Sequence, residues 1–149
     1  MAKNNLVMKD IAVNVKDTIA SSVETIYQSI IQAEKLCGYF TTNSSGNLQE
    51  GKTITWEFEN NYKTDIYEIK LAPNKQINFT WGTTGSSTTV EIVLTSINDT
   101  LAKIDITESS YPFDEKGVKT ALGQTQGWTD FICSLKAYLY ANINLRKGR

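Results

Sequence analysis

The sequence of 149 residues contains no histidine. This absence excludes Ser-His-Asp and Cys-His catalysis, and it excludes zinc or iron sites that are built on histidine ligands. It also removes the side chain that is best suited to transfer protons near neutral pH. Any catalysis by this chain would therefore depend on carboxylates, tyrosine, lysine or a bound cofactor.

Cysteine is scarce, since only Cys37 and Cys133 occur, and the two lack the spacing of metal ligands. We expect both to be reduced thiols, and we expect neither a metal site nor a cofactor. No apolar run is long enough to span a membrane, and residues 1–10 lack the apolar core of a signal peptide. Together these absences predict a cytoplasmic protein.

The chain also lacks an excess of charge of either sign. Its 15 Lys and Arg residues nearly balance its 16 Asp and Glu residues, so there is no electrostatic footprint for nucleic acid. The basic end, Arg146-Lys147-Gly148-Arg149, is predicted to be a solvated tail rather than a phosphate contact. The length of the chain and its 40% of hydrophobic residues predict a single domain, 1–149, with a core at about 11–145.

Long helical patterns are equally rare, and one stands out near the C-terminus. Its apolar residues recur at spacings of three and four, which places them on one face of an amphipathic helix. They are Trp128, Phe131, Ile132, Leu135, Tyr138 and Leu139. Extended backwards, the same face reaches Thr125, Gln124 and Ala121, which are polar or small.

The polar half of this helix face has two interpretations. Gln124 and Thr125 would each cost about 1–3 kcal/mol if they faced a dry core unsatisfied, so the face is expected to border a wet cavity. Alternatively, the helix begins near Gln126 and leaves Gln124 in a loop. On a neighbouring strip, Gly123 and Gly127 are expected to permit a close backbone approach or some flexibility.

Before this helix, the chain predicts one strand, two short helices and a meander of strands. Residues 11–16 alternate as in a strand with one buried face. Residues 21–24, Ser-Ser-Val-Glu, predict a capping box that opens the first helix, and residues 34–40 predict the second. Tyr27 lies on the packing face of the first helix, where its ring suits the core and its hydroxyl suits a cavity.

The meander that follows comprises about five or six strands, so the whole chain predicts one α+β domain. Asn60-Asn61 predicts a hairpin turn, and residues 83–87 predict another turn. Several strands have a clear inward face, made of Ile54, Trp56, Phe58, Ile77, Phe79, Trp81, Val90, Ile92, Leu94, Ala102, Ile104 and Ile106. Residues 62–71 do not alternate cleanly, so the sequence does not assign their inward face.

Two of these strand faces are aromatic: Trp56 with Phe58, and Phe79 with Trp81. If their strands are neighbours, the four rings line one surface of the sheet. Burial of each ring contributes on the order of a few kcal/mol, so the rings are either plain core or the wall of a cavity. The two interpretations overlap, because a sheet that curves around a helix often leaves a pocket at one end.

Glu108 is in phase with Ile104 and Ile106, near the end of a strand. A carboxylate that faces the interior needs a partner or a cavity, and burial would tend to raise its pKa. The alternative is that the strand frays before Ser109 and leaves Glu108 solvated.

The order and spacing of these features resemble a known family. The residues that carry the resemblance are 19–27, Leu36, Tyr39-Phe40, Gly51, Trp56, Phe58, Pro73, Ile77, Phe79-Thr80-Trp81, Gly127-Trp128, Leu135 and Tyr138-Leu139. From about Ile11 to Leu145, the chain resembles the SRPBCC or START-like superfamily. Within it, the chain is most similar to the group named for the activator of heat-shock protein 90 ATPase homologue 1.

The resemblance implies a helix-grip (START-like, Bet v 1-like) fold. In this fold an antiparallel sheet of about six or seven strands wraps around a long C-terminal helix, and two short helices follow the first strand. A cavity between sheet and helix holds a hydrophobic or amphipathic small molecule in many members. The residues that match its wall by position are Tyr27, Phe40, Trp56, Phe58, Phe79, Trp81, Gln124 and Trp128.

Three functions are compatible with this resemblance. The first is a small-molecule binding protein with a lipid-like or aromatic ligand, as a monomer or a homodimer. The second is a regulator of a heat-shock protein 90 ATPase, with the chaperone as its partner. Small bacterial-type members lack the separate chaperone-binding domain of the eukaryotic activator, and we expect the same here. The third is a cyclase- or hydrolase-like enzyme that uses Glu108 and Tyr27 as acid and base.

Overall fold

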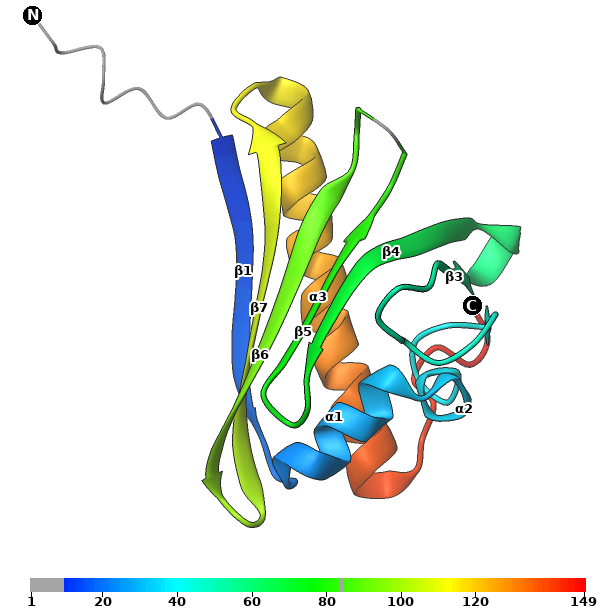
Figure 1. The fold of residues 1–149 in the computed structure, drawn as a ribbon, viewed down its shortest axis with the longest axis vertical. Helices are drawn as coiled ribbons and strands as arrows, with labels where there is room; N and C mark the ends of the chain where they lie inside the picture. Colours follow the sequence, from blue (N-terminus) through cyan, green and yellow to red (C-terminus); the bar gives the residue numbers. More distant parts are fainter. Residues whose placement is uncertain (1–9, 84) are drawn as a thin grey trace, which may run out of the picture.

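A computed structural model describes residues 10–83 and 85–149 of the chain (Figure 1). The elements in chain order are β1 (Asp10–Ile19), α1 (Val23–Ile31), α2 (Ala33–Leu36), β2 (Asn43–Ser44), β3 (Ile54–Glu57), the 3-10 turn η2 (Glu59–Asn61), β4 (Lys63–Ala72), β5 (Gln76–Trp81), β6 (Thr88–Asn98), β7 (Leu101–Pro112) and α3 (Glu115–Ala141). The expected absence of a signal-peptide core concerns residues 1–9, which lie outside the described residues. Thr84 in the turn expected at residues 83–87 does so too.

Within the described residues, seven strands form one antiparallel sheet in the order β1-β7-β6-β5-β4-β3-β2. The long helix α3 runs along one face of this curved sheet, and α1 and α2 lie beside its C-terminal half (Figure 1). The expected α+β helix-grip architecture is confirmed. The inward-facing strand residues and the apolar face of α3 form one buried cluster, as the alternating pattern predicts.

The helix α1 begins one residue later than the expected capping box implies. Ser22, and not Ser21, is its N-cap, because the Ser22 side chain accepts a hydrogen bond from the backbone N–H of Thr25 at 3.2 Å. Glu24 therefore occupies the second helical position, and the capping box read from Ser21 and Glu24 is wrong.

The irregular pattern of β4 has a local cause. Its register against β5 shifts between Tyr67 and Lys70, and Glu68 has a positive φ of 50°. Such a bulge adds a residue to one strand, so Ile66 and Ile69 both face the core although three positions separate them. The expected Asn60-Asn61 turn is also observed, with φ values of 63° and 60° at the two residues.

The helix α3 starts well before Gln126, so the prediction of a late start is wrong. Asp114 is its N-cap and accepts a hydrogen bond from the backbone N–H of Gly117 at 2.7 Å. A close backbone approach occurs at Gly117, which the sequence did not single out, because an added Cβ there would collide with the Pro112 carbonyl oxygen. At Gly123 and Gly127 an added Cβ would meet nothing within 4 Å, so they permit no such approach.

No helix among the described residues is long and apolar enough to cross a membrane. In the same part of the chain, Cys37 and Cys133 are both free thiols.

Candidate ligand-binding pocket

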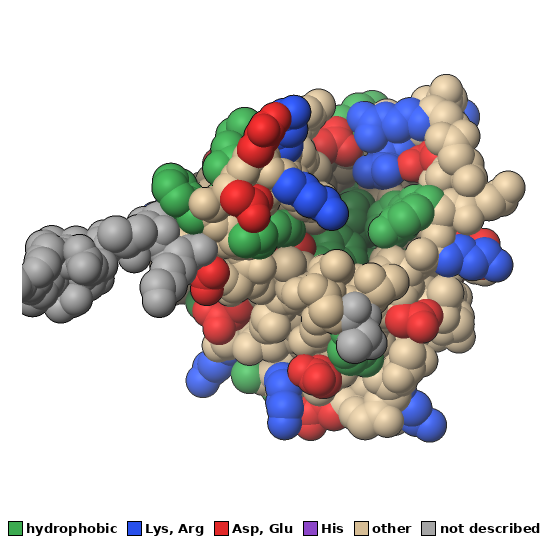
Figure 2. Space-filling model, turned by 90° about the horizontal axis from the view of Figure 1, so that it is seen from above, with side chains coloured by type: hydrophobic (Ala, Val, Ile, Leu, Met, Phe, Trp, Pro, Cys, Tyr) green, Lys and Arg blue, Asp and Glu red, His purple; other side chains and the backbone are tan. Residues whose placement is uncertain are grey.

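A pocket of about 530 Å³ lies under the N-terminal half of α3. Its wall is formed by α3, by the adjoining ends of β5, β6 and β7, by the turn between β3 and β4, and by Phe40 and Arg146 from outside the regular elements. From outside, the space-filling view shows a hollow with hydrophobic side chains at its base and charged side chains on its rim (Figure 2).

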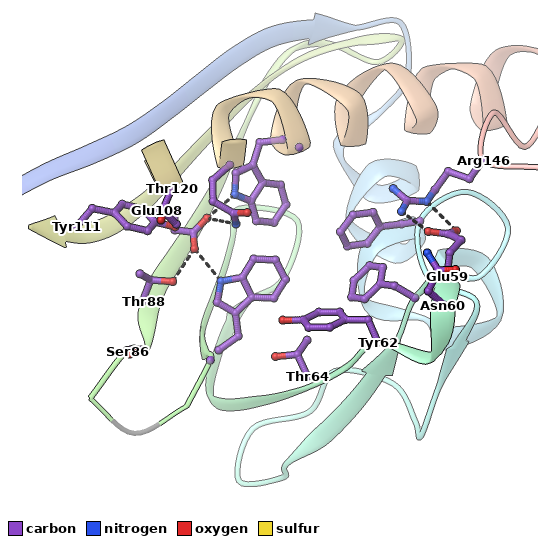
Figure 3. A pocket seen from close by; sticks show the side chains of 17 residues that line it. Glu59, Asn60, Tyr62, Thr64, Ser86, Thr88, Glu108, Tyr111, Thr120 and Arg146 are labelled. Atoms are coloured by element: carbon purple, nitrogen blue, oxygen red, sulfur yellow. Dashed lines mark hydrogen bonds and ion pairs between the residues drawn. The ribbon is translucent and has the colours of Figure 1, made fainter. Parts of the chain in front are cut away.

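The carboxylate of Glu108, on β7, is the organising group at one end of this pocket (Figure 3). Its Oε1 accepts hydrogen bonds from Trp128 Nε1 at 2.8 Å and Gln124 Nε2 at 3.0 Å. Its Oε2 accepts from Trp81 Nε1 at 2.8 Å and Thr88 Oγ1 at 2.5 Å. A carboxylate offers about four acceptor positions, so these four donors occupy its full capacity.

Glu108 is only 1% exposed, yet it is held as an anion. Burial raises its pKa, but hydrogen bonds from Thr88, Gln124 and Trp81 outweigh burial and hold the pKa below its ordinary value. Burial and the neighbouring carboxylate in turn raise the pKa of Tyr111. The expected rise in the Glu108 pKa is therefore wrong, because four polar side chains replace the water that burial removes.

The alternative in which the strand frays and leaves Glu108 solvated is also wrong. The strand β7 continues past Ser109 as far as Pro112, with Glu108 opposite Val13 on β1 and Val90 on β6. Neighbours on both sides fix the backbone at this point, so the side chain keeps the inward phase of Ile104 and Ile106.

The shared carboxylate brings two indole rings together. Trp81 ends β5 and Trp128 lies in the middle of α3, and their ring centroids are 5.5 Å apart with 31° between the planes. Trp56 meets Trp81 edge-on at 6.1 Å, and Phe40 packs near Trp128 at 6.2 Å. Contacts of this kind favour one arrangement of the rings, so this wall of the pocket has a fixed shape.

The opposite end of the pocket is closed by Arg146. Its guanidinium donates two hydrogen bonds to Glu59, at 2.6 and 3.2 Å, and one to Asp130 at 3.3 Å. It also lies over the rings of Phe40 and Phe58, 5.6 and 5.8 Å from their centroids. The prediction that Arg146 belongs to a solvated tail is therefore wrong.

The pairing with Arg146 also changes the acidity of Glu59. The hydrogen bonds from Arg146 hold the pKa of the Glu59 carboxyl below its ordinary value, against the opposing effect of burial. Arg149 adds an ion pair to Asp130 at 3.0 Å, but it is far more exposed than Arg146. The end of the chain is exposed on both sides of Arg146, whose side chain alone turns back over the aromatic rings.

The residues expected to line a cavity are distributed between the pocket and the core. Phe40, Phe58, Trp81, Gln124 and Trp128 line the pocket. The other three, Tyr27, Trp56 and Phe79, are buried and are not among its lining residues.

Two further expectations concern Thr125 and Tyr27. Thr125 is exposed and bonds back to the Ala121 carbonyl oxygen at 2.8 Å, so only Gln124 of the expected polar pair faces the pocket. Tyr27 lies in α1, where burial raises the pKa of its hydroxyl. Glu108 therefore lines the pocket, whereas Tyr27 lies in the core and is not a lining residue, so the two side chains do not meet in the pocket.

Several pocket residues had no place in the sequence prediction. Thr88 shares the inward phase of Val90 and Ile92, so alternation alone was enough to find it. Tyr62, Glu59 and Arg146 follow no periodic pattern, because they come from a turn and from the end of the chain. No group of three His, Cys, Asp or Glu side chains in residues 10–83 and 85–149 is placed to hold a metal ion.

Comparisons with known proteins agree with this architecture. Residues 20–140 match the family described as Activator of Hsp90 ATPase homolog 1-like protein. No curated protein matches the sequence. Among solved structures, the protein SSP2350 from Staphylococcus saprophyticus is 28% identical, with 91% of this chain and 96% of that chain covered and a TM-score of 0.78.

Two more distant structures share the fold. The Aha1 dimer from Colwellia psychrerythraea is 23% identical, with 93% of this chain and 99% of that chain covered and a TM-score of 0.74. DynU16, described as a putative protein in the dynemicin biosynthetic locus, is 19% identical with a TM-score of 0.77. The match covers 88% of this chain but only 48% of DynU16.

Proposed function

This chain belongs to the Activator of Hsp90 ATPase homolog 1-like family, and on that premise we propose that it is a small-molecule binding protein. Its ligand is aromatic or amphipathic and occupies the pocket between the sheet and the N-terminal half of α3. One observation carries the proposal: the two pocket tryptophans, Trp81 and Trp128, are fixed by a single buried carboxylate at the edge of an open cavity.

The cost of that arrangement supports a binding role. Burial of an ionised carboxylate without a cation is unfavourable. Two tryptophans in an ordinary hydrophobic core pack against each other without any buried carboxylate. Here Glu108 fixes the orientation of both indoles beside a space that their own side chains do not fill. Walls that are rigid before binding lower the entropic cost of ordering a ligand.

The size and lining of the pocket match a small organic ligand. Its volume of about 530 Å³ lies within the usual range for ligand sites, roughly 300–1,000 Å³. Aromatic rings form much of the wall, and the hydroxyls of Tyr62, Thr64 and Thr120 offer a few polar contacts (Figure 3). Aromatic rings combined with polar and charged side chains in one wall suit an amphipathic molecule, whose apolar and polar parts both find partners.

Tryptophan fluorescence tests the proposal, because the chain has three tryptophans and two of them line the pocket. A panel of fatty acids, flavonoids and polycyclic aromatics is titrated into the W56F variant, in which Trp81 and Trp128 supply the emission. We expect a saturable change with at least one compound. W81F is the matched variant and should lose most of that change. If neither this panel nor a set of aromatic organic cations gives a saturable change in the wild-type protein, the proposal fails.

A second candidate function has its support in the family itself. The match over residues 20–140 favours a regulator of an Hsp90-type ATPase that acts by surface contact. We propose it as the alternative to ligand binding, and the test is the ATPase rate of the cognate chaperone at saturating amounts of this protein. An unchanged rate removes this candidate.

The geometry gives little support to a third candidate function, that of a cyclase- or hydrolase-like enzyme. The four acceptor positions of Glu108 are occupied, so the carboxylate has no free position from which to take a proton from a ligand. Tyr27, the other candidate, does not line the pocket.

The location and oligomeric state of the chain are also proposals. We propose a cytoplasmic protein that is a monomer or a homodimer. The solution structure of the Colwellia psychrerythraea protein is a dimer, and β1 and β2 leave both edges of the present sheet unpaired in the described residues. Light scattering of the purified protein measures the oligomeric state directly.

A further inference from the structure

Each end of the pocket combines a carboxylate with two aromatic side chains, but within the described part of the chain only one end contains a cation. At one end a carboxylate, Glu59, and two aromatic rings, Phe40 and Phe58, surround the guanidinium of Arg146. At the other end a carboxylate, Glu108, bonds two aromatic side chains. In the described residues, no Lys or Arg forms an ion pair with Glu108. The second arrangement thus lacks the cation that the first contains.

The charge of the pocket is negative as a result. Its lining carries two carboxylates and one guanidinium, and that guanidinium is already neutralised by Glu59 and Asp130. The charge of Glu108 is compensated only by neutral donors, which satisfy its hydrogen bonds but leave its net charge in place. Because burial weakens screening by water and salt, this charge acts on any molecule that enters the pocket.

The aromatic side chains near Glu108 suit a cation for a further reason. Ring faces attract cations, and tryptophan does so most strongly. Each indole N–H of Trp81 and Trp128 donates to the carboxylate, which polarises its ring and increases the electron density of its face. Tyr62 and Thr64 lie between the Glu108 end and the Arg146 end of the pocket, so the space beside the indoles is bordered by a third ring (Figure 3).

We propose that the ligand is an organic cation whose quaternary or tertiary ammonium group lies beside Trp81, Trp128 and Tyr62, in the field of Glu108. The inference rests on the proposed ligand-binding function and names the class of ligand. A primary ammonium group is a poorer match, because it needs acceptors for three N–H groups and the carboxylate has none left. A quaternary group needs only charge and ring surface.

Three compounds of equal shape and different charge test this inference. They are benzyltrimethylammonium, its uncharged carbon isostere neopentylbenzene, and benzylsulfonate. Their dissociation constants are measured from the indole N–H signals of the wild-type protein. We expect the ammonium compound to bind at least about tenfold more tightly than the isostere, since one favourable charge contact contributes about that factor. The sulfonate should bind most weakly.

Two variants locate the origin of the preference. E108Q should bring the affinity for the ammonium compound close to that for the isostere. The control E91Q removes the same charge from an exposed position on β6 and should change neither affinity. If E108Q does not fold, E59Q takes its place, because it leaves Arg146 less neutralised and should weaken the ammonium compound while strengthening the sulfonate.

The outcomes separate this inference from the function on which it rests. Equal binding of the ammonium compound and the isostere, or tighter binding of the sulfonate, overturns the cation preference and leaves ligand binding in place. The cation preference is also overturned if all three fail to bind while a fatty acid, a flavonoid or a polycyclic aromatic from the first panel binds. If neither the three compounds nor the panel bind, the proposed function is overturned as well.

Discussion

Trp81 and Trp128 lie on different elements, β5 and α3, yet both donate their indole N–H to Glu108 and lie with ring centroids 5.5 Å apart. One carboxylate thereby ties the end of the sheet to the middle of the helix. The same contact fixes the wall of the pocket. The stability of the fold and the shape of the pocket therefore both depend on Glu108, and substitutions of this residue should affect both.

We predict that E108Q lowers the free energy of unfolding at pH 7 by about 2–4 kcal/mol. The amide has one acceptor oxygen in place of two, so at least one of the four donors loses its partner inside the protein, at about 1–3 kcal/mol for each such group. Denaturant unfolding followed by far-UV circular dichroism measures the change. The control E91Q should stay within about 0.5 kcal/mol of the wild-type protein. A loss of stability equal to that of E91Q would contradict the account.

The pH dependence of stability follows from the lowered pKa of Glu108. A carboxyl whose pKa is lower in the folded than in the unfolded state stabilises the protein above its unfolded pKa, and this contribution disappears as the pH falls through the folded pKa. We therefore expect the contribution of Glu108 to be complete above about pH 4.5, its ordinary value, and to be lost below it. Asp17 and Glu59 also have lowered pKa values and contribute to the pH dependence of stability. The difference in the free energy of unfolding between wild type and E108Q, measured across the pH range, isolates the contribution of Glu108.

The indole N–H signals report the same titration residue by residue. In a ¹H–¹⁵N spectrum, the Trp81 and Trp128 signals should move together with one midpoint below 4.5 as Glu108 takes up its proton. Trp56 is the internal control, since its Nε1 has no hydrogen-bond partner among the described residues. Independent midpoints for Trp81 and Trp128 would show that they do not share a carboxylate.

Arg146 and Arg149 make a matched pair near the end of the chain. R146Q should lower the free energy of unfolding by about 1–2 kcal/mol, because its half-buried guanidinium contacts Glu59, Asp130 and two aromatic rings. R149Q should cost less than about 0.5 kcal/mol, since Arg149 is more exposed and, among the described residues, pairs only with Asp130. Equal effects in thermal denaturation would show that Arg146 is solvated, as the sequence alone suggested.

Two glycines of α3 should respond to alanine in opposite ways. G117A should cost about 2 kcal/mol or more, because its Cβ would collide with the Pro112 carbonyl oxygen and the backbone would have to move. G123A should raise stability by about 0.5–1 kcal/mol, since its Cβ meets nothing within 4 Å and alanine is the better helix former. Both values come from denaturant unfolding, and a stable G117A would contradict the close approach of β7 to α3.

Much of the fold could be predicted because its signals are local and periodic. Alternation identified the buried faces of β5, β6 and β7, and spacings of three and four identified the apolar half of α3. The first half of α3 gave a weaker signal, since Val118 and Leu122 are exposed and do not follow the apolar face. The bulge at Glu68 broke the alternation of β4, so its buried face had to come from the structure.

The candidate site could be predicted only in part, because most of its contacts join distant parts of the chain. Strand alternation placed Trp81 and Glu108 toward the interior, and helical spacing did the same for Gln124. No local pattern, however, showed that the three side chains would contact one another. The charge state of Glu108 depends on donors from three elements, so the sequence suggested the wrong direction for its pKa. The contact of Arg146 with Glu59 and Phe40 depends on where the chain turns after α3, and no periodic pattern encodes that turn.

The central claim is that a small molecule binds beside Trp81 and Trp128, and the indole N–H spectrum of the wild-type protein during ligand titration tests it most directly. The account predicts that at least one compound from the panel or the ammonium series shifts the Trp81 and Trp128 signals with one dissociation constant. The signal of Trp56, which does not line the pocket, should move less. Titrations that leave the Trp81 and Trp128 signals in place with every compound would contradict the account.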